Sequence, residues 1–179
     1  MCVRCYVLRR ISYDSATEFG RCVFEINGKY LLMKRAENRR IAPGVWSGIG
    51  GHIEPPEINN PLETCYREIE EETGIMRHDV SALELRYIIT RRRADEISVI
   101  YVFFGETTQS DFTKTDEGDL QWIPENELLE REYSQTYAAM LEHYVSRSRQ
   151  DRAVYVGVAD DDNGKMKMTW TRCEDFETW

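Results

Sequence analysis

A segment with clear helix punctuation, residues 61–74, constrains the fold more than any other part of the sequence. Pro61 suits the first turn of a helix, where its missing N–H removes no intrahelical hydrogen bond, and Asn60 can cap the helix in front of it. Gly74 can end the helix in a left-handed conformation. We therefore expect one helix over residues 61–73, with the rest of the chain packed around it.

The two sides of this helix predict different environments. Successive helical residues turn by about 100°. The expected core face consists of Leu62, Tyr66, Ile69 and Thr73. Glu68, Glu71 and Glu72 share another side at spacings of three and four residues, where like charges repel by a few tenths of a kcal/mol per pair. A hard divalent cation explains such a stripe, although for the helix alone a solvated glutamate face is the commoner explanation.

Strand-like segments lie on both sides of the helix. Asn27-Gly28, a strong two-residue turn signal, separates the strands of a hairpin expected over residues 20–35. The other predicted elements are a hairpin at 83–106, a strand at 120–123, a short helix from Pro124, a longer helix from Ser134 to Ser146, and a hairpin at 153–170 around a turn at 160–164. This order predicts an α+β fold, with a mixed sheet packed by helices rather than regular βαβ units.

Length and composition limit the classes of protein to which the chain can belong. Its 179 residues fit one domain, which we place at residues 1–149, with a C-terminal hairpin extension at 150–179 packed on that domain. A formal net charge of −9 weighs against binding to a nucleic acid polymer, which needs a basic surface. No apolar run is long enough to cross a bilayer and the N-terminus lacks a signal-peptide layout, so we expect a cytoplasmic protein without a membrane partner.

The five cysteines are odd in number and widely spread, which does not indicate a disulfide scaffold. Cys2 and Cys5 form a lone C-x-x-C pair, without the second pair or the histidines that a zinc site needs. Ordinary strand cysteines explain them better than a structural metal.

A glycine-rich segment at residues 48–57 favours a ligand site next to the helix over a merely solvated face. Gly48, Gly50 and Gly51 let the backbone bend sharply or approach a ligand closely. Glu57 lies just before the helix, where a fourth carboxylate can join the cluster.

These residues match the motif G-x5-E-x7-R-E-U-x-E-E-x-G-U, in which U is an apolar residue. Gly51 and Glu57 fit its first part, and residues 67–75 fit its whole second part. The chain therefore resembles the Nudix hydrolase family from about residue 18 to residue 148, and most closely its MutT-like branch. Nine residues separate Glu57 from Arg67 where the family usually has seven, so Asn59-Asn60 looks like an insertion that lengthens the loop without rotating the helix.

The resemblance implies an α/β/α sandwich around a mixed sheet and an enzyme that uses Mg²⁺, with Mn²⁺ as a substitute, to cut a phosphoanhydride bond. It implies that Glu68, Glu71 and Glu72, joined by Glu57, hold the metal ion. Arg67 is expected to orient the glutamates by ion pairing.

The expected substrate is a small nucleotide. The MutT-like branch implies a nucleoside triphosphate, oxidised dGTP included, which is cut to a monophosphate and pyrophosphate. Glu71 and Glu117 are the two candidates for the base that accepts the proton of the attacking water. The predicted substrate-binding residues are Trp46, Ser47, Gly50, Gly51 and Arg91.

Several of these residues have a second explanation. Ser47 stands where many such enzymes carry Asn, which weakens any specificity for oxidised guanine. Trp46 and Trp122 can stack on a base, but strand aromatics more often belong to the core. The arginines at 91–93 can clamp phosphates or form a solvated turn.

Three other functions stay open on the same fold. The first is hydrolysis of ADP-ribose or a dinucleotide polyphosphate. The second is a non-catalytic nucleotide-sensing module, although such modules often lose motif glutamates that are all present here. The third is a diphosphate isomerase, whose cysteine and glutamate pair is not recognisable. The C-terminal hairpin can cover the site, pair with a sheet edge or build a homodimer.

Overall fold

The structure is a computed structural model that describes residues 16–39, 42–93, 96–113, 115–147, 150–162 and 165–174. Its strands are β1 (Ala16–Ile26), β2 (Lys29–Arg35), β3 (Trp46–Ser47), β4 (Val80–Arg93), β5 (Glu96–Thr107), β6 (Gly118–Pro124), β7 (Val154–Asp162) and β8 (Lys165–Cys173). Its α-helices are α1 (Pro61–Thr73) and α2 (Gln135–Val145), and 3₁₀ turns lie at Pro55–Glu57, Arg77–Asp79 and Glu125–Glu130.

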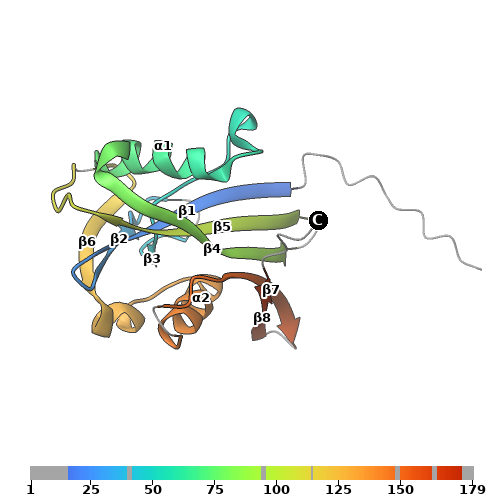
Figure 1. Ribbon diagram of the computed structural model, residues 1–179. Coiled ribbons are helices and arrows are strands. Elements are labelled where there is room, and N and C mark those ends of the chain that lie inside the picture. Colours follow the sequence, from blue (N-terminus) through green and yellow to red (C-terminus); the bar gives the residue numbers. More distant parts are fainter. Residues whose placement is uncertain are drawn as a thin grey trace, which may run out of the picture.

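One mixed sheet runs through the molecule, with α1 on one face and α2 on the other (Figure 1). The described strands follow the order β3-β2-β1-β5-β4-β7-β8, and β6 pairs with β2 outside this path. The β1–β5 and β4–β7 pairs are parallel, whereas the other pairs are antiparallel. This architecture confirms the predicted α+β class and the sandwich around a mixed sheet.

The three predicted hairpins are present. Asn27 and Gly28 have φ values of 49° and 74°, the left-handed region that a tight two-residue turn requires. The β4–β5 hairpin is longer than expected, and residues 94–95 at its tip lie outside the described residues. The turn residues 163–164 of the third hairpin also lie outside them.

Helix α1 begins and ends where the sequence predicts. Pro61 occupies its first turn, and Gly74 (φ 74°) donates its backbone N–H to the Glu70 carbonyl at 3.0 Å. Asn60 stands at the N-cap position, but the expectation that its side chain caps the helix is wrong, because that side chain makes no capping hydrogen bond. The Asn60 carbonyl instead accepts the N–H of Glu63 at 3.0 Å.

The buried face of α1 is rotated from the predicted one. Cys65, Ile69 and Thr73 are almost fully buried, whereas Leu62 and Tyr66 are only partly buried beside them. Gly20 on β1 explains the rotation, since a Cβ there would lie 3.1 Å from Cγ2 of Thr64 and 3.3 Å from the Cys65 sulfur. A glycine at this point lets the helix backbone approach the sheet closely.

Two apolar cores lie on opposite faces of the sheet. The α1 side includes Phe24, Leu31 and Ile69, and the α2 side includes Val102, Met140 and Leu141. Cys22 and Cys65 are buried free thiols, and Cys173 is an exposed one; Cys2 and Cys5 lie outside the described residues. Within the described part of the chain, no helix combines the length and apolar character needed to cross a membrane.

The C-terminal hairpin extends the sheet and folds against α2 (Figure 1). Gly157 of β7 lies opposite Ile89 of β4. The Trp170 ring of β8 stacks on His143 of α2, with centroids 4.7 Å apart and an interplanar angle of 27°. A Cβ on Gly157 would lie 2.3 Å from Cζ3 of Trp170, so the indole packs directly on that backbone. Of the three roles considered for the hairpin, pairing with a sheet edge is the one present in the structure.

These contacts predict that the hairpin and the domain unfold together. Trp170→Ala should lower the free energy of unfolding of the whole chain by about 2 kcal/mol, because it removes a partly buried aromatic side chain. Thr169→Ala, on an exposed neighbour in the same strand, should change it by less than about 0.5 kcal/mol. Urea unfolding followed by far-UV circular dichroism measures both; an unchanged midpoint for Trp170→Ala would show that the hairpin is not coupled to the domain.

Candidate functional site

A cavity of about 810 Å³ opens on the α2 side of the sheet. Its floor comes from β4 and β5, where Ile89, Ile100 and Val102 supply apolar side chains. Its walls come from β3, the start of α2, the loop after β2, and the glycine-rich segment at residues 50–52. Three residues of α1, namely Arg67, Glu68 and Glu72, also line it. The cavity therefore combines an apolar floor with charged side chains.

Most of the predicted site residues line this cavity. They are Trp46, Ser47, Gly50, Gly51, Arg67, Glu68, Glu72, Arg91 and Glu117. Glu57 and Glu71 do not line it. The fold therefore brings residues outside the motif, from Trp46 to Glu117, into one cavity with the motif residues.

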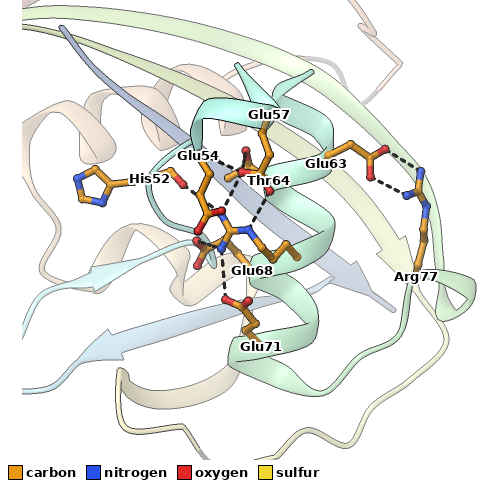
Figure 2. Close-up of polar contacts among 9 residues, drawn as sticks. His52, Glu54, Glu57, Glu63, Thr64, Glu68, Glu71 and Arg77 are labelled. Carbon is orange, nitrogen blue, oxygen red and sulfur yellow. Dashed lines mark hydrogen bonds and ion pairs between the residues drawn. The ribbon is translucent and has the colours of Figure 1, made fainter. Parts of the chain in front are cut away.

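A cluster of carboxylates surrounds the Arg67 guanidinium, and in Figure 2 Glu57, Glu68 and Glu71 point toward that common position. The Nε of Arg67 donates to Glu57 at 2.8 Å, and its Nη1 donates to Glu68 at 2.7 Å and to Glu71 at 3.3 Å. Its Nη2 donates to the His52 carbonyl at 3.1 Å. Arg67 thus has the orienting contacts expected of it, and it also ties α1 to the glycine-rich segment.

Glu57 reaches this cluster despite the longer loop. Its carboxylate accepts hydrogen bonds from Arg67, from the Thr64 hydroxyl at 2.8 Å and from the Glu54 N–H at 3.1 Å. Mainly because of the hydrogen bond from Arg67, the pKa of Glu57 is lowered to about 2. A carboxylate engaged in this way anchors Arg67.

Glu72 occupies a different position, because it is only 8% exposed although it was predicted on the polar side of the helix. Its Oε2 accepts the N–H of Gly50 at 3.0 Å. Gly50 has a φ of 135°, and a Cβ there would lie 2.2 Å from the Gly20 carbonyl oxygen, so only glycine fits. Burial, with smaller contributions from the nearby charges of Glu68 and Glu117, raises the pKa of Glu72 to about 7, although the Gly50 N–H opposes this shift.

The donor set fits a hard divalent cation in its chemistry. Glu68 and Glu72 both line the cavity, and burial raises the pKa of each. Gly51 leaves room for one of them, since a Cβ there would lie 2.3 Å from Oε1 of Glu68. Crowded, desolvated carboxylates next to a backbone without a side chain are the arrangement that a bound cation would stabilise.

The three motif glutamates do not converge on one point, which corrects the expectation from the sequence. Glu71 has a side chain 60% exposed, and Arg67 holds it outside the cavity. Across the described residues, no group of three His, Cys, Asp or Glu side chains is close enough to form a preassembled metal site. Glu72 is buried against Gly50, whereas the exposed Glu71 contacts Arg67. Whether Glu71 and Glu57 bind a metal stays a prediction.

The two tryptophans differ in position. Trp46 lines the cavity at 9% exposure, with the Arg131 guanidinium 5.8 Å from its ring centroid. Trp122 packs against the core on the α1 side and donates its Nε1–H to the Ser110 carbonyl at 2.8 Å. Trp122 is therefore a core residue rather than a base-stacking one, whereas Trp46 can contact a ligand in the cavity.

The cavity also contains residues that sequence reasoning missed. Arg21 on β1, Arg35 at the end of β2 and Arg39 after β2 all line it. Arg39 forms an ion pair with Glu117. An arginine directly before the apolar run Cys22, Val23 and Phe24 was the available signal for Arg21, but nothing local predicts that these cations lie near the glutamates.

Comparisons with known proteins agree with this geometry. The family model described as NUDIX domain matches residues 16–144. A protein named nucleoside triphosphatase NudI from Salmonella paratyphi B is 35% identical, over 57% of this chain and 77% of its own length. Two solved structures, each 22% identical, share the fold. A MutT protein from Bacillus halodurans has a TM-score of 0.68, covering 86% of this chain and 97% of its own, and a NUDIX hydrolase from Nitrosomonas europaea has 0.69, covering 82% and 80%.

The Arg67 cluster predicts a measurable contribution to stability. Arg67→Gln should lower the free energy of unfolding by about 2 kcal/mol, because it leaves the largely buried carboxylates of Glu57 and Glu68 without their counterion. Arg77→Gln is the matched control, since Arg77 pairs with Glu63 on another side of α1 (Figure 2) but is 58% exposed. That change should lower stability much less than Arg67→Gln does, because solvent screens an exposed ion pair. Equal losses in a denaturant titration would contradict the prediction.

Proposed function

The chain belongs to the Nudix hydrolase family, and from this premise we propose that it uses Mg²⁺ to hydrolyse a nucleoside triphosphate to the monophosphate and pyrophosphate. The observation that carries the proposal is the cavity, which joins the carboxylates of Glu68, Glu72 and Glu117 to an apolar floor. Such a cavity suits a substrate with a metal-bound phosphate chain at one end and a planar base at the other. The relative named nucleoside triphosphatase supports this substrate class.

Glu68 and Glu72 are the residues that would hold Mg²⁺, with Glu71 and Glu57 as further predicted ligands. The bound ion would neutralise the phosphate oxygens and lower the pKa of a water molecule. Arg67 would fix the orientation of Glu68 while the substrate binds, because its guanidinium is anchored on Glu57.

The chemical step is a water attack on phosphorus. A bond forms between the water oxygen and the phosphorus atom, the phosphoanhydride P–O bond breaks, and the leaving phosphate oxygen takes the electron pair. A glutamate accepts the proton released by the water, and Glu71 and Glu117 are the candidates. Glu117 is favoured by its position in the cavity, and Glu71 by its place in the family motif.

The substrate-binding residues follow from the two ends of the cavity. Trp46 and the apolar floor would pack on the base, and Ser47 would meet its polar edge. Gly50 and Gly51 would let the phosphate chain approach the backbone, and Arg91 would contribute a positive charge. We also propose that residues 150–174 belong to the same folding unit as the family domain; a homodimer and a cytoplasmic location stay predictions.

A nucleotide panel with Mg²⁺ and chromatographic identification of products tests the proposal. We expect a nucleoside triphosphate to give its monophosphate and pyrophosphate, and we expect EDTA to abolish turnover. Glu72→Gln should lower kcat at least about a hundredfold, while Glu63→Gln, on the same helix but paired with Arg77, should retain near-normal kcat. Release of single phosphate, or a clear preference for ADP-ribose or a dinucleotide polyphosphate, would refute the proposed substrate class.

A pair of variants identifies the base. If Glu71 accepts the proton, Glu71→Gln should lower kcat by about a hundredfold or more and remove the acidic limb of the pH–rate profile. If Glu117 does so, Glu117→Gln should give that result instead. Near-normal turnover in both variants would exclude both candidates.

A further inference from the structure

We propose that Arg39 is a phosphate-binding residue that exchanges its ion pair with Glu117 for the phosphate chain of the substrate. This inference rests on the proposed function and deepens it, since it assigns a second wall of the same cavity, formed by Arg21, Arg35 and Arg39. None of the residues on that wall belongs to the motif that marks the family.

Arginine side chains crowd this wall of the cavity. Arg21, Arg35 and Arg39 all line it, although the chain as a whole carries a net charge of −9. Burial is the main reason why the pKa of Arg35 is lowered, and like-charge repulsion from Arg21 and Arg39 lowers it further. The carboxylates of Glu117 and Glu72 offset part of this repulsion, and a phosphate chain would bring further negative charge to the same cations.

The Arg39–Glu117 ion pair connects this wall to the carboxylate wall. Glu117 is close enough to Glu72 to raise its pKa, so its carboxylate lies within the field of the glutamates on α1 as well as beside Arg39. The side chains of Arg39 and Glu117 are 38% and 33% exposed, respectively. A pair this exposed stabilises the fold little, and its partners can separate at low cost.

The backbone on both sides of the pair is held in place. The Ala36 N–H donates to the Glu117 carbonyl at 3.0 Å, and the Arg39 N–H donates to the Ala36 carbonyl at 3.1 Å. A Cβ on Gly118 would lie 2.2 Å from the Lys34 carbonyl oxygen, so the two segments are in close contact. The exchange therefore needs rotation of two side chains on backbone that these hydrogen bonds hold in place.

Charge balance gives the exchange its direction. If Glu117 turned toward Glu72 and the Mg²⁺ proposed to bind there, Arg39 would lose its counterion. A phosphate oxygen is the natural replacement, because a planar guanidinium matches phosphate geometry with two parallel hydrogen bonds. Binding of the phosphate chain with its metal ion would thus separate the pair and leave neither member without a partner.

Binding of inorganic tripolyphosphate in the presence of Mg²⁺, measured by calorimetry, tests the assignment without turnover. Arg39→Gln should weaken binding roughly tenfold, the loss expected for charge-assisted hydrogen bonds. Glu117→Gln should strengthen binding at least about threefold, because it releases Arg39. The double variant should bind no better than Arg39→Gln. Arg77→Gln, which removes an ion-paired arginine remote from the cavity, should bind like the unchanged protein.

Opposite shifts in tripolyphosphate affinity in the two single variants would indicate phosphate binding by Arg39. A merely structural ion pair would instead give similar changes in the thermal midpoint of both variants and no change in anion affinity. With the preferred triphosphate and Mg²⁺, Arg39→Gln should raise KM roughly tenfold and leave kcat within about threefold. Tripolyphosphate affinity within twofold of the unchanged protein in Arg39→Gln would overturn the inference. Failure of every nucleoside triphosphate as a substrate would instead overturn the proposed function, so the two results are separable.

Discussion

The site depends on one guanidinium surrounded by carboxylates. Without Arg67, the acidic side of α1 would place several negative charges within a few ångströms of one another beside a folded glycine-rich segment. With it, Glu57 is anchored, Glu68 is directed into the cavity, and the His52 carbonyl is tied to the helix. The cluster therefore holds α1 and the glycine-rich segment together and fixes the orientation of Glu57 and Glu68.

Glycines set the distances on which this joint relies. Gly20 admits α1 to the sheet, Gly50 brings its N–H to Glu72, and Gly51 leaves space for Glu68. At each of these three glycines, the Cβ of any other residue would clash with the neighbouring atoms and push the two segments apart. The cavity lining consequently combines carboxylates, arginine side chains and an apolar floor.

The sequence was sufficient wherever a feature is local. The turn at Asn27-Gly28, the bounds of α1 and the helix from Ser134 depend on neighbouring residues, and all are present. The burial of Glu72 could not be predicted, because it depends on Gly50, which is 22 residues away. The Arg39–Glu117 pair likewise depends on the pairing of β2 with β6, which no local pattern specifies.

The C-terminal hairpin has a consequence for solubility. Strand β4 carries Tyr87, Ile88 and Ile89 along the edge that β7 covers, and an uncovered strand of this composition is a template for aggregation. Adding β7 and β8 moves the open edge to a strand that bears Lys165 and Lys167, whose charges oppose pairing with another chain. A nascent chain has no such protection until β7 and β8 leave the ribosome. Truncation near residue 150 would therefore yield an aggregation-prone protein even though every site residue is present.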